Sequence, residues 1–336
     1  MLPDPALSLT IPSIHDHTVL DCRVYHPQSL SANPRAPAWK RHAAILAHPY
    51  APLGGCFDDP VLAEATAQLL RIGYLVATFN FRGAGSSAGR TSWTAKPEGD
   101  DYKTVIGFIV YYIHYLDPFR QPLSTADGRL DPAVTPGPRS RHPRLIIGGY
   151  SYGSIVTMQL PALGAILEPF ASPAAGSAAA QVRLRAEHLA TQCNEVLSSA
   201  RDRPDAAAPE RLSPLPELTA PRPAYLLISP VHGVAKHLAL MNLWSSTPSR
   251  SHNHKALEDR EAKLVHNPTL AVYGDRDGFV AASKLRSWAA RLSGQEGSMF
   301  SAVEVAHGGH FWVEEGVLQQ LKTAIEKFAS SLLTET

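Results

Sequence analysis

The clearest chemistry in this sequence belongs to a serine that stands between glycines. The pentapeptide Gly149-Tyr150-Ser151-Tyr152-Gly153 has the pattern G-x-S-x-G and directly follows the apolar run Arg144–Gly148. Because a helix-forming stretch comes next, we predict a tight strand-turn-helix junction that lifts the Ser151 hydroxyl above a sheet edge, where it can act as a nucleophile. The backbone N–H of Tyr152, at the helix start, would face a developing oxyanion. The competing interpretation is a glycine-rich turn whose serine has no chemical role.

A nucleophilic serine needs a base that accepts its proton, and the base needs an acid that orients it. Two carboxylates, Asp275 and Asp277, follow the apolar run Thr269–Tyr273. We predict that Asp277 is the acid, since a carboxylate placed one short turn beyond a strand end can reach under an imidazole. Asp275 is expected to hydrogen-bond within its turn or to pair with Arg276.

Two histidines follow the last apolar run, Ser301–Val305. We predict His310 as the base, because it stands after two glycines and before an aromatic pair, Phe311 and Trp312, that could brace it. His307 lies nearer the end of the run and is the weaker candidate. A metal site on the two histidines is not expected, because no cysteine or carboxylate cluster completes a ligand set, and no cofactor is predicted.

The elements that must position these residues follow from the hydrophobic pattern. Short apolar runs rich in β-branched residues alternate with helical patterns, which predicts an α/β fold whose mostly parallel sheet of eight strands carries helices on both faces. The first two runs predict an antiparallel edge pair, and the later, continuous runs are typical of strands covered on both faces. Strands are expected at Ala6–Ile14, Leu20–Tyr25, Ala43–Ala47, Leu75–Asn80, Arg144–Gly148, Ala224–Ile228, Thr269–Tyr273 and Ser301–Val305. Helices are expected at Pro60–Ile72, Gly99–Leu116, Tyr152–Leu163, Ala178–Ala200, Ala281–Leu292 and Glu314–Leu333.

Two segments interrupt the alternation of strands and helices. Asp117–Pro143 is rich in proline and polar residues and predicts a long surface loop. The segment 164–223 is rich in Ala, Pro and Ser. We interpret it as an inserted lid or binding element, with a surface extension as the alternative. The chain is thereby divided into core residues 1–163, the insertion at 164–223 and core residues 224–336.

Another glycine-containing loop follows the run Ala43–Ala47 and reads His48-Pro49-Tyr50-Ala51-Pro52-Leu53-Gly54-Gly55, while Phe79–Ser87 follows the next run. With these loops, and with its serine, aspartate and histidine in that chain order, the sequence resembles the α/β-hydrolase superfamily. It is similar to the branch that has a His-Pro turn and a Gly-Gly pair, and to hydrolase-like proteins of fungal metabolite pathways. The resemblance implies an α/β-hydrolase sheet and a second oxyanion N–H from Tyr50, beside that of Tyr152.

Three residues near these loops are given supporting roles. Pro49 has no N–H and cannot itself be an oxyanion donor. His48 is expected to hold its loop by hydrogen bonding. We interpret Arg82, which follows the neighbouring strand, as a fastener of the loops, with a clamp for a substrate carboxylate as the alternative.

Apolar and aromatic side chains supply the candidates for substrate contact. They are Tyr150, Phe311 and Trp244, and Trp244 ends an apolar stretch that follows the run Ala224–Ile228. Residues after that strand often cover the pocket in such folds, which favours an apolar acyl or aromatic substrate. Ordinary core packing is the alternative.

The bulk composition limits the partners and the compartment. The chain has 336 residues, of which 44% are hydrophobic, and a net charge of +1. This balance gives no electrostatic reason to expect a nucleic acid, and no window approaches the roughly 18 apolar residues of a membrane span. Three irregularly spaced cysteines, and a start without a basic and apolar leader, predict a cytoplasmic protein. Nothing in the sequence indicates an oligomeric state.

These residues together predict a serine hydrolase that cleaves a carboxylic ester or thioester of a small apolar or acyl substrate through an acyl-enzyme. A biosynthetic acyltransferase or cyclase of secondary metabolism would use the same residues, with a substrate hydroxyl or amine in place of water. A non-catalytic binding protein on the same fold is the second alternative, although such a role would not require all three residues. A peptidase is less favoured, because nothing identifies a pocket for a peptide amine or side chain.

Overall fold

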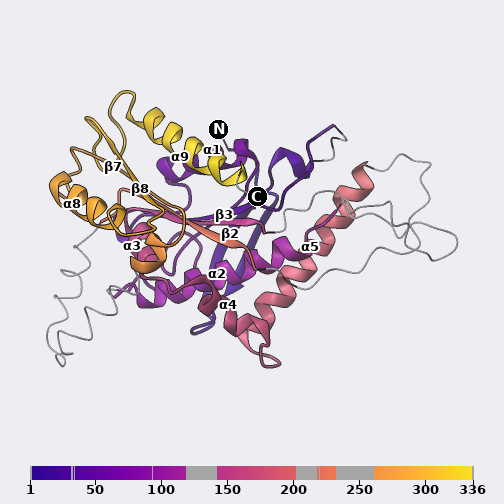
Figure 1. The fold of residues 1–336 in the computed structure, drawn as a ribbon. Helices are drawn as coiled ribbons and strands as arrows, with labels where there is room; N and C mark the ends of the chain where they lie inside the picture. Colours follow the sequence, from indigo (N-terminus) through magenta and orange to yellow (C-terminus); the bar gives the residue numbers. More distant parts are fainter. Residues whose placement is uncertain are drawn as a thin grey trace.

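An eight-stranded, mostly parallel sheet runs through the middle of the protein (Figure 1). A computed structural model describes residues 2–31, 33, 35–92, 94–118, 142–201, 218, 220–231 and 261–334. The strands are β1 Leu7–Pro12, β2 Val19–Tyr25, β3 Ala43–Ala47, β4 Leu75–Phe79, β5 Arg144–Tyr150, β6 Arg222–Ile228, β7 Thr269–Gly274 and β8 Phe300–Val305. Their order is β1-β2-β4-β3-β5-β6-β7-β8, and only the pairs β1–β2 and β2–β4 are antiparallel. The predicted strands and the predicted antiparallel edge pair are confirmed.

Alternate side chains of each central strand enter two different cores, which explains why these strands are apolar throughout. In β3, Ala43, Ile45 and Ala47 belong to one core, while Ala44 and Leu46 belong to the other. Strands β5 and β6 divide their side chains in the same way. A face open to water would instead have favoured a polar residue at every second position.

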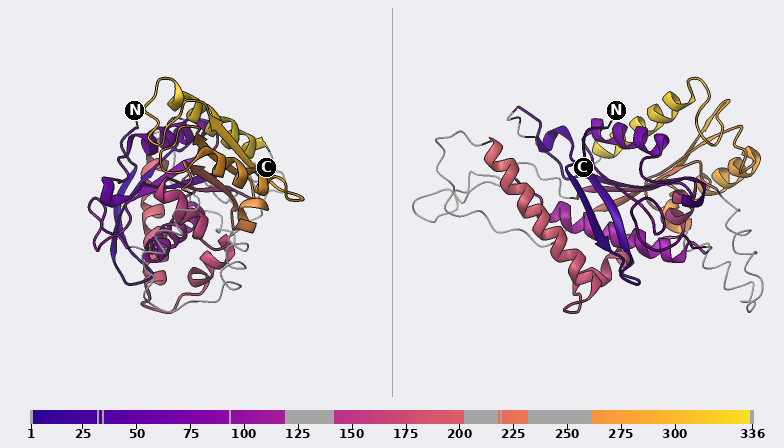
Figure 2. Two further views of the ribbon diagram at one scale, coloured as in Figure 1. Left: turned by 90° about the vertical axis from the view of Figure 1, so that its left-hand side faces the viewer. Right: turned by 180° about the vertical axis from the view of Figure 1, so that it is seen from behind.

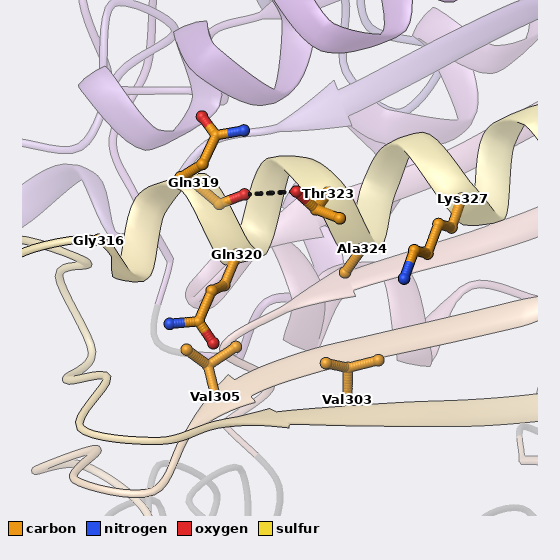
Figure 3. A pocket seen from close by; sticks show the side chains of 8 residues that line it. All are labelled: Val303, Val305, Gly316, Gln319, Gln320, Thr323, Ala324 and Lys327. Carbon is orange, nitrogen blue, oxygen red and sulfur yellow. Dashed lines mark hydrogen bonds between the residues drawn. The ribbon is translucent and has the colours of Figure 1, made fainter.

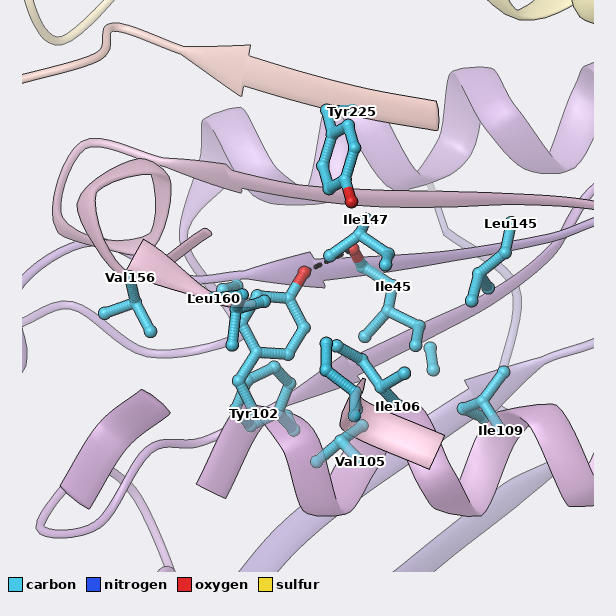
Figure 4. Packing of buried hydrophobic residues seen from close by; sticks show 14 of the residues in the cluster. Ile45, Tyr102, Val105, Ile106, Ile109, Leu145, Ile147, Val156, Leu160 and Tyr225 are labelled. Atoms are coloured by element: carbon cyan, nitrogen blue, oxygen red, sulfur yellow. Dashed lines mark hydrogen bonds between the residues drawn. The ribbon is translucent and has the colours of Figure 1, made fainter. Parts of the chain in front are cut away.

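Helices cover both faces of the sheet, as predicted (Figure 1, Figure 2). They are α1 Pro60–Ile72, α2 Lys96–Tyr115, α3 Tyr152–Gln159, α4 Leu163–Ala171, α5 Ala178–Arg201, α8 Ala282–Ser293 and α9 Val317–Thr334. The apolar sides of α1 and α9 join one core, and those of α2, α3, α4, α5 and α8 join the other. Figure 4 shows Val105 and Ile106 of α2 packed beside Ile45 of β3.

Helix α1 illustrates how local residue types fix an element. Its N-terminus is capped by the Asp59 carboxylate, which accepts the N–H groups of Val61 at 2.9 Å and Leu62 at 3.1 Å. Its C-terminus is followed by Gly73, whose φ of 109° is readily adopted only by glycine. The predicted helix bounds, Pro60–Ile72, are therefore confirmed to the residue.

Two elements beside the predicted nucleophile differ in length from the prediction. Strand β5 continues to Tyr150, which pairs with Ile228 of β6. Helix α3 ends at Gln159, and Leu160 is extended because the following Pro161 disfavours the helical conformation at the preceding residue. The chain bends by 74° before α4 begins. None of the described helices is by itself long and apolar enough to cross a bilayer; α3 and α4 meet that test only as this bent pair.

The predicted insertion begins with helices that lie against the body of the fold. Helix α5 packs along α2, and its Val182, Ala186 and Ala190 are buried in the shared core. The Asn194 amide of α5 donates to the carbonyl of Tyr115 at the end of α2, with a 2.9 Å distance. This part of the segment is therefore packed as a core helix, and the lid predicted for 164–223 is not confirmed. Residues 202–217 and 219 of that segment, and 119–141 of the predicted surface loop, lie outside the described residues.

A groove of about 320 Å³ lies at the sheet edge between β8 and α9 (Figure 3). Val303 and Val305 form its apolar side, and Gln320 and Lys327 of α9 border it. None of its lining residues belongs to the predicted catalytic set.

Candidate functional site

Ser151 stands at the junction between β5 and α3, in a turn that needs small flanking residues. Its backbone has φ 54° and ψ −112°, a conformation that residues with a side chain rarely adopt. A Cβ at Gly153 would lie 2.2 Å from the carbonyl oxygen of Ala47, and a Cβ at Gly149 would lie 2.3 Å from the carbonyl carbon of Gly153. The two glycines therefore let the turn close against β3. Backbone strain of this kind is typical of functional sites.

The structure brings Ser151, His310 and Asp277 into one chain of hydrogen bonds. Nε2 of His310 lies 2.8 Å from Oγ of Ser151, and Nδ1 lies 2.7 Å from Oδ2 of Asp277. The side chains of His310 and Asp277 are only 4% and 1% exposed. Because a carboxylate can only accept, Nδ1 carries the proton and the lone pair of Nε2 faces the Ser151 hydroxyl. This is the arrangement that a general base requires.

Asp277 is held in place by its own turn. Its Oδ1 accepts the backbone N–H groups of Phe279 at 2.8 Å and Val280 at 3.2 Å. The two carboxylate oxygens thus have separate partners, with Oδ2 directed at His310. Asp275 has no such contact with His310. The side-chain hydrogen bond expected for Asp275 is not formed at its buried Oδ1, which lacks a partner among the described residues.

The loops that carry Asp277 and His310 meet backbone to backbone. A Cβ at Gly274 would lie 1.9 Å from the carbonyl oxygen of Gly308, and the N–H of Arg276 donates to that same carbonyl at 2.9 Å. His307 is exposed and takes no part in the hydrogen-bonded chain. Within the described chain, no three or more His, Cys, Asp or Glu residues form a group that could hold a metal ion.

The backbone carbonyl of His310 is held from two sides. The Tyr150 hydroxyl donates to it at 2.9 Å and the Ser229 hydroxyl at 3.4 Å. Ser229 in turn accepts the Nε1–H of Trp312 at 3.0 Å. We call Tyr150, Ser229 and Trp312 the carbonyl clamp. All three side chains are buried, so these bonds are shielded from water and fix the backbone from which the imidazole projects.

The carbonyl clamp corrects one prediction and adds a residue that the sequence did not reveal. Tyr150 is a predicted substrate contact, but it is 1% exposed, so it supports His310 from within the core instead. Ser229 follows β6 with a φ of 44°. No sequence motif around it indicates a role in the site. Trp312 belongs to the aromatic pair predicted to brace His310, and its indole does so through Ser229.

His48 organises the loop after β3. Its Nε2 accepts the backbone N–H of Phe81 at 2.9 Å, so the ring proton is on Nδ1, which donates to the carbonyl of Pro49 at 2.5 Å. Burial lowers the pKa of His48 to about 4, which keeps the ring neutral at physiological pH. The hydrogen-bonding role predicted for His48 is therefore confirmed.

The same loop brings Tyr50 beside Tyr152. The N–H of Gly55 donates to the carbonyl of Tyr50 at 3.1 Å, and a Cβ at Gly55 would lie 2.3 Å from the Pro49 carbonyl oxygen. The rings of Tyr50 and Tyr152 are 5.1 Å apart between centroids. Tyr152 is the first residue of α3, where the N–H has no acceptor within the helix. Among the turn and loop hydrogen bonds of the described residues, none is donated by the N–H of Tyr50 or Tyr152.

Arg82, which follows β4, joins helix α2 to the turn between β1 and β2. Its Nε and Nη2 donate to Asp101 of α2 at 2.9 and 2.7 Å. Its Nη1 and Nη2 donate to Asp16, in the turn between β1 and β2, at 2.8 and 3.2 Å. The guanidinium is thus committed to two carboxylates of the protein. The structure supports the predicted fastener and not the substrate clamp.

We expect Asp101→Asn to lower the free energy of unfolding by about 3–5 kcal/mol. Asp101 is fully buried, so its loss leaves the buried Arg82 charge without its main partner. Urea unfolding followed by circular dichroism would measure the change.

Asp16→Asn is the matched control, since the Asp16 side chain is 39% exposed and its loss leaves the Arg82–Asp101 pair intact. Hydrogen bonds from Arg82 lower the pKa of Asp16 below its ordinary value of 3.8. The stability that Asp16 contributes is therefore present above that ordinary value and is lost as the pH falls through the lowered one. A larger loss in Asp16→Asn than in Asp101→Asn would contradict the ranking.

Two exposed phenylalanines pack beside the ring of His310. The ring centroids of Phe279 and Phe311 lie 4.3 and 5.4 Å from that of His310, and 5.9 Å from each other. Phe279 is 48% and Phe311 61% exposed, so apolar surface is open beside the imidazole. The structure thus places Phe311, a predicted substrate contact, next to the site. Trp244, the remaining candidate, lies outside the described residues.

The chain has the α/β-hydrolase fold, and the solved structures that resemble it include α/β serine hydrolases and esterases. An α/β serine hydrolase without a lid from Xanthomonas campestris is 18% identical, with a TM-score of 0.53 over 99% of this chain and 97% of that one. Est1E from Butyrivibrio proteoclasticus, solved with bound ferulic acid, is 14% identical, with a TM-score of 0.52 over 97% and 99%.

An esterase from Pyrococcus furiosus is 12% identical, with a TM-score of 0.51 over 97% of this chain and 92% of that one. No family model and no curated protein sequence matches the chain. At these identities the likeness establishes the fold alone, and the chemistry has to be argued from the site.

Proposed function

We propose that this protein is a serine hydrolase that cleaves a carboxylic ester or thioester of a small apolar or acyl substrate through an acyl-enzyme. The observation that carries the proposal is the buried chain of hydrogen bonds from Asp277 through His310 to Ser151. A binding protein has no need of a strained serine aligned on the lone pair of a buried imidazole. The esterases among the structural neighbours support the ester class.

Acylation would begin when Nε2 of His310 takes the proton of the Ser151 hydroxyl and Oγ attacks the substrate carbonyl carbon. The backbone N–H groups of Tyr152 and Tyr50 are the proposed donors to the resulting oxyanion. Asp277 stabilises the imidazolium through Nδ1. As the tetrahedral intermediate collapses, the imidazolium gives its proton to the departing alkoxide or thiolate, and the acyl group stays on Ser151.

Deacylation would repeat these steps with water as the nucleophile. Nε2 of His310 takes a proton from water, the hydroxide oxygen attacks the acyl carbon, and the same two N–H groups stabilise the oxyanion. The proton then returns to Ser151 Oγ as the carboxylic acid leaves. The carbonyl clamp would matter in both halves, because it holds the backbone of His310 while the imidazole gains and loses a charge.

A fluorophosphonate probe tests the proposal directly, since an activated serine displaces its fluoride and becomes phosphonylated. We expect the wild type to be labelled at Ser151 and Ser151→Ala to remain unlabelled. Ser331→Ala, on the exposed side of α9, should be labelled like the wild type. An unlabelled wild type, or a label that persists in Ser151→Ala, would refute the nucleophile.

A further inference from the structure

We propose that Phe279 and Phe311 bind the leaving group of the substrate, and that they select esters or thioesters whose alcohol or thiol carries an aromatic ring. This inference rests on the proposed function and adds to it a preference for one kind of leaving group. We call the two side chains the aromatic rim.

The chemistry of the intermediate assigns each substituent of the reacting carbon to one place. The oxyanion has to face the N–H groups of Tyr152 and Tyr50. The leaving oxygen or sulfur has to come within about 3 Å of Nε2 of His310, because that nitrogen returns the proton to it. The acyl chain takes the remaining direction and has no requirement to approach the imidazole. Side chains that flank the imidazole therefore contact the leaving group.

The aromatic rim is placed for this contact. The Phe279 ring lies 4.3 Å from the imidazole of His310, and the Phe311 ring lies 5.4 Å from it at an interplanar angle of 87°. The two rings make an angle of 79° with each other. A planar ring on the leaving group can thus meet one phenylalanine by its face and the other by its edge, which are the favoured aromatic geometries. Both rings are substantially exposed, so this surface is open to a ligand.

The backbone of Phe279 belongs to the site, whereas the two rings touch His310 only by ring-to-ring packing. The N–H of Phe279 holds Asp277, and alanine at this position keeps that N–H. Neither ring is part of the buried core. Phe279→Ala and Phe311→Ala should therefore remove the rim and leave the hydrogen-bonded chain of Ser151, His310 and Asp277 in place.

The test compares kcat/KM for benzyl acetate and ethyl acetate in the wild type and both alanine variants. The two alcohols have similar acidity, and both esters form the same acetyl-enzyme, so any difference arises during acylation. We expect the wild type to prefer benzyl acetate by roughly 100-fold. Each alanine variant should reduce this ratio by about ten-fold. The ratio of ethyl hexanoate to ethyl acetate, which varies only the acyl group, should stay as in the wild type.

Leu184→Ala, which removes a similarly exposed apolar side chain from α5, is the control and should keep both ratios. Fluorophosphonate labelling of each variant would show that its serine remains active. An unchanged benzyl-to-ethyl ratio in both rim variants overturns the inference, as does an equal fall in the acyl ratio. A labelled wild type that hydrolyses both acetates equally well also overturns it and leaves the proposed function standing. A wild type that is neither labelled nor active on any of these esters refutes the proposed function itself.

Discussion

Replacing Ser151 with alanine should lower kcat for ester hydrolysis by about a million-fold, and His310→Ala should cost nearly as much. The 2.8 Å contact between Ser151 Oγ and His310 Nε2 makes the nucleophile and the base a single unit. The double variant should therefore be little slower than either single variant, because each single change already abolishes attack by Ser151 assisted by His310. Initial rates on a nitrophenyl acetate, divided by the total concentration of each purified protein, would measure the three values.

Ser331→Ala is the control for this series and should keep the rate of the wild type. Alanine at position 151 inherits the same positive φ as serine, so the unfolding midpoint should change little in Ser151→Ala. Losses that multiply in the double variant would mean that the two residues act independently. Such a result would contradict the single unit that the geometry indicates.

Asp277→Asn should lower kcat by about ten-thousand-fold while the fold is preserved. In the wild type, Oδ1 of Asp277 is held by the N–H groups of Phe279 and Val280. The same donors would hold the amide oxygen of asparagine, so its NH₂ group would face Nδ1 of His310. Nδ1 would then have to accept, the ring proton would move to Nε2, and the imidazole could no longer take a proton from Ser151.

Asp275→Asn offers a closely matched comparison, because Asp275 is two residues away and does not contact His310. Its kcat should stay within a few-fold of the wild type. Steady-state kinetics on one ester, with both proteins checked by circular dichroism, would compare them. Equal losses in the two variants would show that charge in the loop matters rather than the tautomer of His310.

The strands and the hydrogen-bonded chain were accessible from sequence for one physical reason. Parallel strands present their carboxyl ends at the same edge of a sheet, so residues placed just after successive apolar runs are brought together. Ser151, Asp277 and His310 each follow such a run. These positions can be read directly from the sequence, without knowledge of which distant residues are in contact. The competing residues lie close by: Asp275 is two positions before Asp277, and His307 is three positions before His310. The conformations of the turns after β7 and β8 decide which residue of each pair reaches the site.

The carbonyl clamp and the packing of α5 were beyond that reasoning. Ser229 and Tyr150 are 81 and 160 residues from His310 along the chain, and they meet at its carbonyl only because β5 and β6 are paired in the sheet. No periodicity or spacing encodes such a contact. In the same way, an alanine-rich helix has the same sequence pattern whether it covers a site or packs along α2. The local sequence therefore could not distinguish a lid from a helix of the core. The oxyanion role of Tyr50 stays a prediction.

The positive φ values of Ser151, Ser229 and Trp312 have a consequence for anyone who wishes to make a more heat-resistant form of this protein. Each such residue costs on the order of 1–3 kcal/mol, and the three surround one histidine. Glycine at these positions would relax the backbone, yet it would also remove the nucleophile or loosen the support of the imidazole. Thermal stability and catalytic activity thus make opposite demands on these three residues. Substitutions that raise the thermal stability are best sought in the two cores and on the outer helices.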